Sequence, residues 1–314
     1  MAGDLAAIES SLRGLIEADP DVVSAPMADL FAAGGKRIRP ALVLLTARIG
    51  AYDLDRLTPA AMAAELTHAA TLVHDDVIDR ATVRRGRPTV AARLGDEPAI
   101  VVGDFYFAKA YEQAANTQSP EVVTILAGAV MKICAGEVRQ QAIRHLYETT
   151  TDEYMQRIEA KTATLLAACC EIGALLGALD PGTRAHLRDY GRLLGMAFQI
   201  ADDVLDYTGT EDEVGKPIGH DVAEGFATLP LMLAMEEGPV AGRLSALLRS
   251  GRELSGDEAE QVVAIVRSSR GPQRAIERAR SLAANAQREL VTIDGGEAVK
   301  TLSALAAYVV TRKL

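Results

Sequence analysis

The chain of 314 residues contains no tryptophan, and aromatic residues make up only 4% of it. Proteins that bind single-stranded nucleic acid stack the bases on aromatic side chains. The formal net charge of −10 also opposes contact with a phosphate backbone. Nucleic acid is therefore not an expected partner, although clustered basic residues could still bind a smaller anion.

Cysteine is also scarce, with Cys134 and the adjacent pair Cys169 and Cys170. Neighbouring cysteines in an apolar stretch make a poor disulfide framework, so a reduced, cytoplasmic setting is expected. Residues 1–16 lack the apolar core of a signal peptide. The longest apolar run, 163–179, contains a glutamate and is short for a bilayer crossing, so no membrane span is expected.

What the chain does have is 49% apolar residues in a helical pattern. Apolar side chains recur at intervals of three and four, and alternating strand patterns are almost absent. Capping side chains precede prolines that can begin a helix at Thr58-Pro59, Ser119-Pro120 and Asp180-Pro181, and Ser255 with Glu258 has the spacing of a capping box. Helices are expected at 40–50, 58–80, 97–115, 120–147, 151–178, 181–208, 228–236, 240–249, 256–268, 271–291 and 296–311.

No low-complexity linker divides the chain, so we expect a single all-α domain over residues 1–314. The segment 209–228 is rich in glycine and follows an acidic motif. Two interpretations of it remain open, a lid over an active site and an ordinary helix connection.

Two copies of the pattern Asp-Asp-x-x-Asp each end a long apolar stretch. Their members are Asp75, Asp76 and Asp79, and Asp202, Asp203 and Asp206. Residues i and i+4 of a helix lie on one face, so each copy points two carboxylates the same way. Two like charges about 4 Å apart repel by about 4 kcal/mol at an effective dielectric of about 20. Such carboxylates need cations, and hard oxygen ligands suit Mg²⁺, so the pattern predicts a magnesium site.

Basic residues gather in separate places along the chain. They are Lys36, Arg37 and Arg39, then Arg84, Arg85 and Arg87, then Lys161 and Lys216. Cations held by carboxylates beside lysine and arginine form a site for a polyanion such as a diphosphate. Taken singly, these residues also suit a solvated helix start or the negative end of a helix, and His68 alone suits a packed core.

In their order along the chain, these residues resemble the trans-isoprenyl diphosphate synthases, also called polyprenyl synthetases, and in particular the long-chain type. The matching segments are 34–40, 74–79 with 84–86, 103–105, 136–138, 161–162, 198–199, 202–206, and 215–217 with Asp221. The resemblance implies an isoprenoid synthase fold, a single-domain bundle of about a dozen helices around a deep central cavity. It also implies a magnesium-dependent prenyltransferase that joins isopentenyl diphosphate to an allylic prenyl diphosphate, giving an all-trans polyprenyl diphosphate, and a homodimer.

The resemblance further implies roles for single residues. Asp75, Asp79 and Asp202 would hold magnesium, about three ions per active site, with Asp76, Asp203 and Asp206 as further ligands or outer acceptors. The allylic diphosphate would be bound by Arg84, Lys161 and Lys216, with Thr162 and Gln199 lining the same place. Isopentenyl diphosphate would be bound by Lys36, Arg39, His68 and Arg85, without a metal of its own. Glu137 and Asp104 are expected to be structural.

Product length depends on the residues just before Asp75. In this family an aromatic residue four or five positions earlier stops growth, whereas this chain has Ala70 and Thr71. By analogy we expect a product of about thirty carbons or longer. The small side chains could instead serve close helix packing. A facing helix could also supply a floor through Tyr106, Phe107 or Met131.

Three alternatives remain: a geranylgeranyl diphosphate synthase, a class I terpene cyclase, and a subunit of a two-component synthase. A second diphosphate site disfavours the cyclase, and the retention of both acidic motifs disfavours an inactive subunit. Two positions depart from the family pattern. Phe226 stands where relatives often carry lysine, and Arg139 stands where they carry an apolar side chain.

Overall fold

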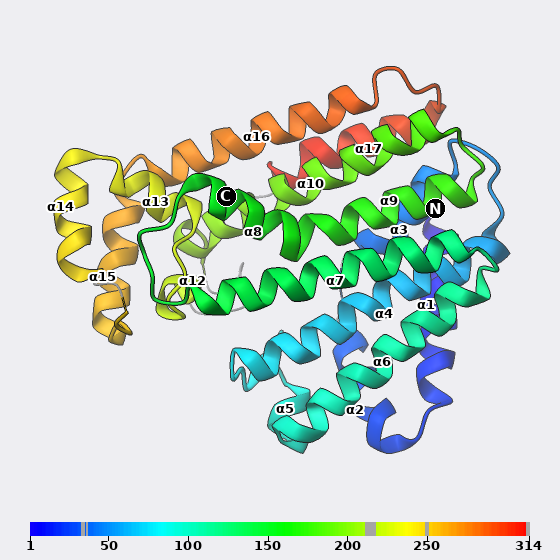
Figure 1. Ribbon diagram of the computed structural model, residues 1–314, viewed down its shortest axis with the longest axis horizontal. Helices are drawn as coiled ribbons and strands as arrows, with labels where there is room; N and C mark the ends of the chain where they lie inside the picture. The colour runs from blue at the N-terminus through cyan, green and yellow to red at the C-terminus, as the bar shows by residue number, and fades with distance from the viewer. Residues whose placement is uncertain (33–34, 36, 211–217, 249–250, 312–314) are drawn as a thin grey trace. The chain divides into compact units, whose positions relative to one another are not determined.

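The chain is helical almost throughout in the computed structural model, which describes residues 1–32, 35, 37–210, 218–248 and 251–311 (Figure 1). The first half contains α1 (Ala2–Glu17), α2 (Asp21–Ala32), α3 (Ile38–Ala47), α4 (Leu54–Ile78), α5 (Val90–Leu94), α6 (Asp96–Asn116) and α7 (Pro120–Ala142). The second half contains α8 (Thr151–Ile158), the π-helical turn η1 (Glu159–Ala163), α9 (Thr164–Leu176), α10 (Pro181–Thr208), α12 (His220–Ala223), α13 (Leu229–Met235), α14 (Gly238–Leu247), α15 (Gly256–Arg267), α16 (Gly271–Glu289) and α17 (Gly296–Val309). The prediction of an all-α fold is confirmed.

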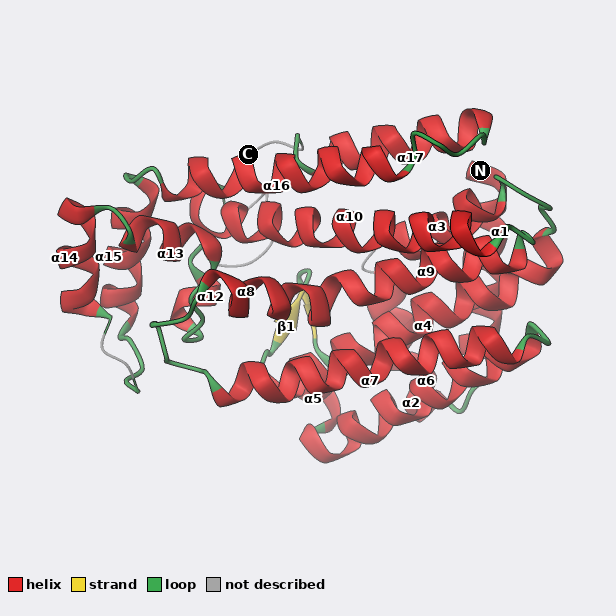
Figure 2. Ribbon diagram, turned by 45° about the horizontal axis from the view of Figure 1, so that its top comes forward, coloured by secondary structure: helices red, strands yellow, loops and turns green. Residues whose placement is uncertain are grey.

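Within the described residues, strand structure is confined to β1 (Val83–Arg84) and β2 (Arg87–Pro88), which pair antiparallel as a small hairpin (Figure 2). None of the described helices combines the length and the apolar character that crossing a bilayer requires.

Two of the three proline-based helix starts are confirmed. Helix α7 begins at Pro120, and α10 begins at Pro181, where the Asp180 side chain accepts hydrogen bonds from the backbone of Gly182 and Thr183. The start expected at Thr58-Pro59 is wrong. Helix α4 already begins at Leu54, because the Asp53 side chain accepts a hydrogen bond from the Asp55 N–H and caps the helix earlier.

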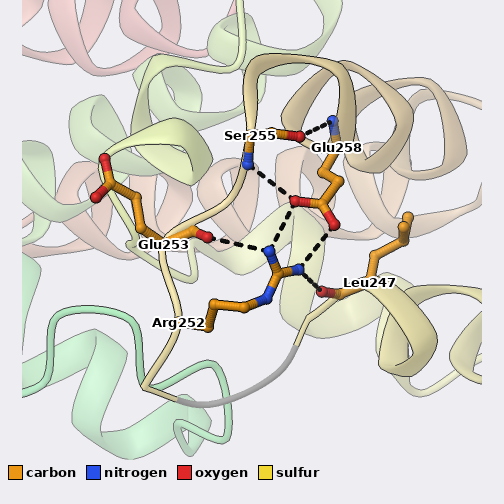
Figure 3. Close-up of polar contacts among 5 residues, drawn as sticks. All are labelled: Leu247, Arg252, Glu253, Ser255 and Glu258. Atoms are coloured by element: carbon orange, nitrogen blue, oxygen red, sulfur yellow. Dashed lines mark hydrogen bonds and ion pairs between the residues drawn. The ribbon is translucent and has the colours of Figure 1, made fainter.

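The expected capping box at α15 is also confirmed, and it is part of a larger polar cluster (Figure 3). Ser255 Oγ accepts a hydrogen bond from the Glu258 N–H, and the Glu258 carboxylate accepts one from the Ser255 N–H. Arg252 donates to both oxygens of the same carboxylate, at 2.9 and 2.8 Å, and to the carbonyl oxygen of Leu247. One guanidinium therefore joins the end of α14 to the start of α15.

Contacts divide the chain into two compact units. The first comprises Met1–Val130, Ala168–Arg188 and Ile293–Thr301, and the second comprises Met131–Ala167, Asp189–Thr292 and Leu302–Leu314. The expectation of one domain over residues 1–314 stays a prediction.

The first unit is built around α4, which packs along α6 and α3 (Figure 1). The close approach of α6 depends on Gly103, since a Cβ there would lie 2.2 Å from the His74 ring. Helix α4 is buried on most sides. Ala64, Thr67 and Ala70 are each at most 1% exposed, so the polar residues of α4 are surrounded by closely packed side chains.

In the second unit α13 packs against α16, and α13, α14 and α15 lie side by side (Figure 1). Helices α8 and α9 are not the single regular helix expected at 151–178, because η1 interrupts them with one wider turn. Two glycines account for this turn. A Cβ on Gly136 would lie 2.7 Å from the Ala160 side chain, and one on Gly195 would lie 2.5 Å from the Ala163 backbone. The wider turn of η1 fits because Gly136 and Gly195 have no side chain that would clash with it.

Candidate active site

The first acidic motif lies at the C-terminal end of α4, with Asp79 as the capping residue. The last turn of this helix carries no basic residue, so the carboxylates add to the negative end of the helix dipole. Asp75 and Asp79 are half-buried, whereas Asp76 is 2% exposed and accepts a 2.7 Å hydrogen bond from Arg84 Nε. Burial raises the pKa of Asp76, and the Arg84 charge opposes that rise.

The second acidic motif occupies the end of α10, whose last turn also lacks a basic residue. Asp202 is half-buried, while Asp203 and Asp206 are 3% and 0% exposed. Tyr154 Oη donates to Asp203 Oδ2 at 2.6 Å, and Gln199 Nε2 donates to Asp203 Oδ1 at 2.8 Å. Burial, and after it the charge of nearby Asp221, raises the pKa of Asp203. A bound cation would oppose this rise and stabilise the carboxylate form of Asp203.

Both helix ends fit magnesium, judged by their donors. No group of three or more histidine, cysteine, aspartate or glutamate side chains converges on one point in the described part of the chain. Mg²⁺ keeps several waters and takes further oxygens from substrate phosphates, so a motif needs to offer only one or two carboxylates. Half-buried Asp75, Asp79 and Asp202 are the accessible donors, while the buried members of each motif are hydrogen-bonded within the protein.

The first unit also contains a cluster of cationic side chains around His68. Burial, and after it the charges of Arg39, Arg85, Arg84 and Arg37, lowers the pKa of His68 well below its ordinary value. Burial and the repulsion by Arg85 likewise lower the pKa of Arg39. Arg39 Nε is a buried donor without a hydrogen-bond partner among the described residues. Guanidinium groups so close together, with a donor unsatisfied, are the arrangement an anion would stabilise.

Two of these arginines have strained backbones. Arg37 and Arg85 have φ values of 46° and 50°, in the left-handed region that non-glycine residues seldom adopt. Arg37 is held there by Glu65 and Glu9, each at 2.8 Å. Arg85 reaches the same place, since a Cβ on Gly35 would lie 3.5 Å from its Nη1. Such strain persists where the surroundings fix a residue for function. The structure thus brings together Arg39, His68 and Arg85, and Lys36 lies outside the described residues.

The residues expected at the allylic diphosphate fall in both units. Arg84 pairs with Asp76, as given above. Lys161 and Thr162 both lie in the η1 turn. Lys161 Nζ is 2.9 Å from Glu137 Oε2, and Thr162 Oγ1 donates to Gln199 Oε1 at 2.7 Å. A π-turn inside a helix is often found at a functional site. Lys216 lies outside the described residues, as does most of the glycine-rich segment.

Of the residues expected to govern product length, only Thr71 is partly exposed. His68, Thr71, Asp75 and Asp79 form a partly exposed row along α4, which rises about 16 Å over these residues. Ala70 is fully buried. Thr71 Oγ1 donates to the His68 carbonyl oxygen at 2.7 Å.

The three alternative floor residues lie in different surroundings. Tyr106 is buried and its hydroxyl lies 3.4 Å from both Asp19 and Val23. Phe107 packs its ring 5.6 Å from that of His74, and Met131 is 68% exposed.

Several residues of the site were missed from the sequence. Tyr154 donates a hydrogen bond to Asp203, Arg157 lies over the Tyr154 ring, and Glu65 pairs with Arg37 of the cationic cluster. Each is a common residue type in a helical pattern. Their only signal is spacing, since Tyr154 and Arg157 lie about two turns and one turn before Lys161, and Glu65 lies about one turn before His68. Of the departures, Phe226 lies under the Arg144 guanidinium at 5.8 Å. Arg139 is exposed, and nothing in the structure explains it.

Comparison with known proteins shows the class to which this all-α chain belongs. The model of the polyprenyl synthetase family matches residues 20–266. The chain therefore belongs to the polyprenyl synthetase family and is a prenyltransferase, which confirms the resemblance inferred from its motifs.

Individual relatives cover nearly the whole chain. The heptaprenyl diphosphate synthase component 2 of Geobacillus stearothermophilus is 39% identical over 98% of this chain and 96% of its own length. The octaprenyl diphosphate synthase of Haemophilus influenzae is 33% identical over 98% and 94%. Both are similar in sequence to this chain at full length.

Solved structures show the same fold. A heptaprenyl diphosphate synthase from Staphylococcus aureus has a TM-score of 0.93 and 31% identity, with 100% of this chain and 98% of that chain covered. A polyprenyl synthase from Caulobacter crescentus, complexed with calcium and isoprenyl diphosphate, has a TM-score of 0.93 and 35% identity, with 100% and 96% covered. The isoprenoid synthase fold implied by the resemblance is thereby confirmed.

Proposed function

We propose that the chain elongates an allylic prenyl diphosphate with isopentenyl diphosphate and releases an all-trans polyprenyl diphosphate. The observation that carries the proposal is the cationic cluster around Arg39 and His68. A terpene cyclase binds one diphosphate, at its acidic motifs. A cluster with a buried, unsatisfied guanidinium donor supplies a second anion site, as a condensation of two diphosphates requires.

In this proposal the two diphosphates are bound by different chemistry. Asp75, Asp79 and Asp202 hold magnesium, with Asp76, Asp203 and Asp206 supporting them, and about three ions would serve one active site. Magnesium held by these carboxylates would supply positive charge to the leaving diphosphate, which would ease cleavage of the allylic carbon–oxygen bond. Arg84, Lys161 and Lys216 bind that same diphosphate. Arg39, Arg85 and Lys36 bind isopentenyl diphosphate.

His68 and the pair of Thr162 and Gln199 have separate tasks. With its lowered pKa, His68 is neutral at pH 7 and donates a hydrogen bond without adding to the charge repulsion among the arginines. Gln199 Oε1 is held by Thr162, so its dipole is fixed for the electron-poor allylic carbon. The double bond of isopentenyl diphosphate then attacks that carbon, and the departing diphosphate accepts the proton that restores a double bond.

A product of about thirty carbons or longer is supported by the absence of a phenylalanine or tyrosine from the partly exposed row of α4, in which Thr71 lies about one turn before Asp75. Long-chain products are named for the relatives above. A geranylgeranyl diphosphate synthase remains the alternative within the same chemistry.

An elongation assay tests the function directly. The purified chain is incubated with isopentenyl diphosphate and, in separate reactions, dimethylallyl, geranyl, farnesyl or geranylgeranyl diphosphate, with Mg²⁺ or with a chelator. Mass spectrometry should show magnesium-dependent polyprenyl diphosphates longer than the twenty-carbon class. A cyclic hydrocarbon formed from allylic diphosphate alone would replace the proposal by a terpene cyclase.

A second candidate follows from the relative named as component 2 of a heptaprenyl diphosphate synthase. The chain would then be one subunit of a two-component enzyme. The same assay decides, because the chain alone should be active if our proposal holds. Activity only after a second, different protein is added would favour the two-component enzyme.

We also propose a homodimer in the cytoplasm. Apolar side chains lie exposed on both α6 and α7, including Ile100 at 44%, Val101 at 64% and Val138 at 71%. Cys134 is exposed on α7, while the other two cysteines are buried. Alkylation of Cys134 by a thiol reagent should therefore become slower as the protein concentration rises. The mass measured by sedimentation should increase over the same range of concentration. A monomer at all concentrations would contradict the homodimer.

A further inference from the structure

Arg157, on α8, is a half-buried cation that the roles assigned above leave unused. Its Nη2 donates a 2.6 Å hydrogen bond to the Ala227 carbonyl oxygen. Its Cζ lies 5.3 Å from the centre of the Tyr154 ring. It forms no ion pair with a carboxylate of the described residues.

Tyr154, beneath this guanidinium, fixes a member of the second acidic motif. The tyrosine is fully buried, and its hydroxyl donates to Asp203 Oδ2 at 2.6 Å. With Gln199 bound to Oδ1, both oxygens of Asp203 are oriented. Arg157 therefore acts on the motif without touching it.

Ala227 links Arg157 to the same motif by a second route. The Asp221 N–H donates a 3.0 Å hydrogen bond to Asp206 Oδ2. The segment 221–227 is thus joined to α10 at its start and to Arg157 at its end. The contacts close a ring that runs through α8, α10 and this segment, and Arg157 is the residue at which both routes meet.

Arg144 binds the same segment and offers a matched comparison. Its Nε donates a 2.8 Å hydrogen bond to the Glu224 carbonyl oxygen, and its guanidinium pairs with the Glu224 carboxylate. It also lies 5.8 Å from the Phe226 ring. Its charge is thus neutralised locally, and it contacts neither Tyr154 nor Asp203 in any of these interactions.

We propose that Arg157 is a positioning residue for the second acidic motif, acting through Tyr154 on Asp203 and through Ala227 on the segment that holds Asp206. The inference rests on the proposed function of this site.

Four proteins test this role: Arg157→Gln, Tyr154→Phe, the double variant, and the control Arg144→Gln. The first readout needs no turnover. The unfolding temperature is measured with inorganic diphosphate present while Mg²⁺ is titrated. The readout is the Mg²⁺ concentration at which half of the full rise in unfolding temperature is reached. The second readout compares the KM of the allylic substrate with that of isopentenyl diphosphate. Tyr154→Phe keeps the ring and removes only the hydroxyl, so it tests the route to Asp203 even if Arg157→Gln fails to fold.

Arg157→Gln and Tyr154→Phe should each raise the Mg²⁺ midpoint and the allylic KM by about 10- to 100-fold, the usual effect of losing a residue that orients a metal ligand. The KM of isopentenyl diphosphate should stay within about twofold, and Arg144→Gln should match the wild type. The double variant should be no worse than the more affected single variant, because the two residues act in series.

A folded Arg157→Gln or Tyr154→Phe with wild-type values in both readouts overturns the inference. An equal loss in Arg144→Gln also overturns it, since loosening of the segment would then suffice. If the wild type makes no polyprenyl diphosphate but its stabilisation by Mg²⁺ and diphosphate is weakened in the variants, the proposed function fails and this inference stands. A wild type that is not stabilised at all overturns both.

Discussion

Lys161 and Glu137 are joined by an ion pair of 2.9 Å, although one lies in the π-turn η1 and the other on α7. The Glu137 side chain is only 13% exposed, and its other oxygen accepts a 2.9 Å hydrogen bond from Gln141 Nε2. The pair gives a chemical reason for the glutamate that the sequence marked as structural. It also holds the lysine in a defined place before any diphosphate arrives.

Lys161→Ala should therefore have two separable effects. Loss of a diphosphate ligand should lower kcat/KM for the allylic substrate by about 100-fold or more. Loss of the partner of Glu137 should lower the free energy of unfolding by about 1–2 kcal/mol, below the value for a fully buried pair because the lysine is 31% exposed.

Adding Glu137→Gln to Lys161→Ala should restore most of the stability and none of the activity. Urea unfolding and steady-state kinetics measure the two effects. A double variant that recovers both would show that Lys161 serves only to neutralise Glu137.

Thr71→Phe should shorten the product. Thr71 lies on the partly exposed row of α4, so the ring can enter space beside the growing chain without repacking the core. Ala70→Phe should act in the same direction but cost about 1–3 kcal/mol of stability, because Ala70 is 0% exposed. Chromatography with mass spectrometry gives the product distribution.

Ala69→Phe is the control for those two variants. Ala69 is also buried, at 4% exposed, and it lies off the row that contains Thr71. It should share the destabilisation of Ala70→Phe while leaving product length unchanged. An unaltered product in Thr71→Phe would remove this residue from the tunnel.

His68 should make the folded protein sensitive to acid. Its pKa is well below 6.5 in the folded state and near 6.5 in the unfolded chain. The unfolded state therefore binds a proton more readily between these values. The stability that His68 contributes is complete above pH 6.5 and is lost as pH falls, by up to about 1.4 kcal/mol per pH unit.

Replacing His68 by Gln removes this proton and should flatten the fall of the unfolding temperature between about pH 7 and pH 5. Calorimetry at closely spaced pH values measures the slope. His186 is the control, because His186→Gln leaves the arginine cluster intact. An identical slope for wild type and His68→Gln would place the proton uptake elsewhere.

Gly195→Ala should disturb the η1 turn. A Cβ at this position would lie 2.5 Å from the Ala163 Cα, which is too close for any real side chain, so α10 and η1 must separate. We expect a loss of about 1–3 kcal/mol in the free energy of unfolding, together with a higher KM for the allylic substrate because Lys161 moves.

Gly242→Ala is the matched control, since no atom lies within 4 Å of a Cβ built there. Gly242 is inside α14, where alanine should stabilise the helix by about 0.5–1 kcal/mol. Equal stability changes of one sign in both variants would show that backbone entropy, and not the packing of η1, decides the outcome.

The acidic motifs could be predicted because they are local. Asp75 with Asp79 is a spacing on one helix, and Asp180 before Pro181 is a cap that needs no partner elsewhere. The same holds for Ser255 and Glu258, whose box formed as expected.

What could not be predicted depends on residues far apart in the chain. The π-turn has room because Gly136 and Gly195 both approach the stretch between α8 and α9, and the sequence around neither glycine indicates that contact. Arg157 belongs to the site through Tyr154 and Ala227, a contact across seventy positions. The hairpin of β1 and β2 is only four residues of strand, too short to leave a pattern. The predicted start of α4 was wrong because Pro59 lies inside the helix, which is capped earlier in the chain by Asp53.

Insertion of a single surplus residue into a regular helix produces the kind of wide turn seen at Glu159–Ala163. Each residue of an ordinary helix turns by about 100° around the axis. The extra residue therefore rotates the side chains that follow it relative to those that precede it. Deletion of one residue within this stretch would restore a continuous, regular α-helix. Lys161 and Thr162 would then swing away from Glu137 and Gln199 as a block, without alteration of either residue.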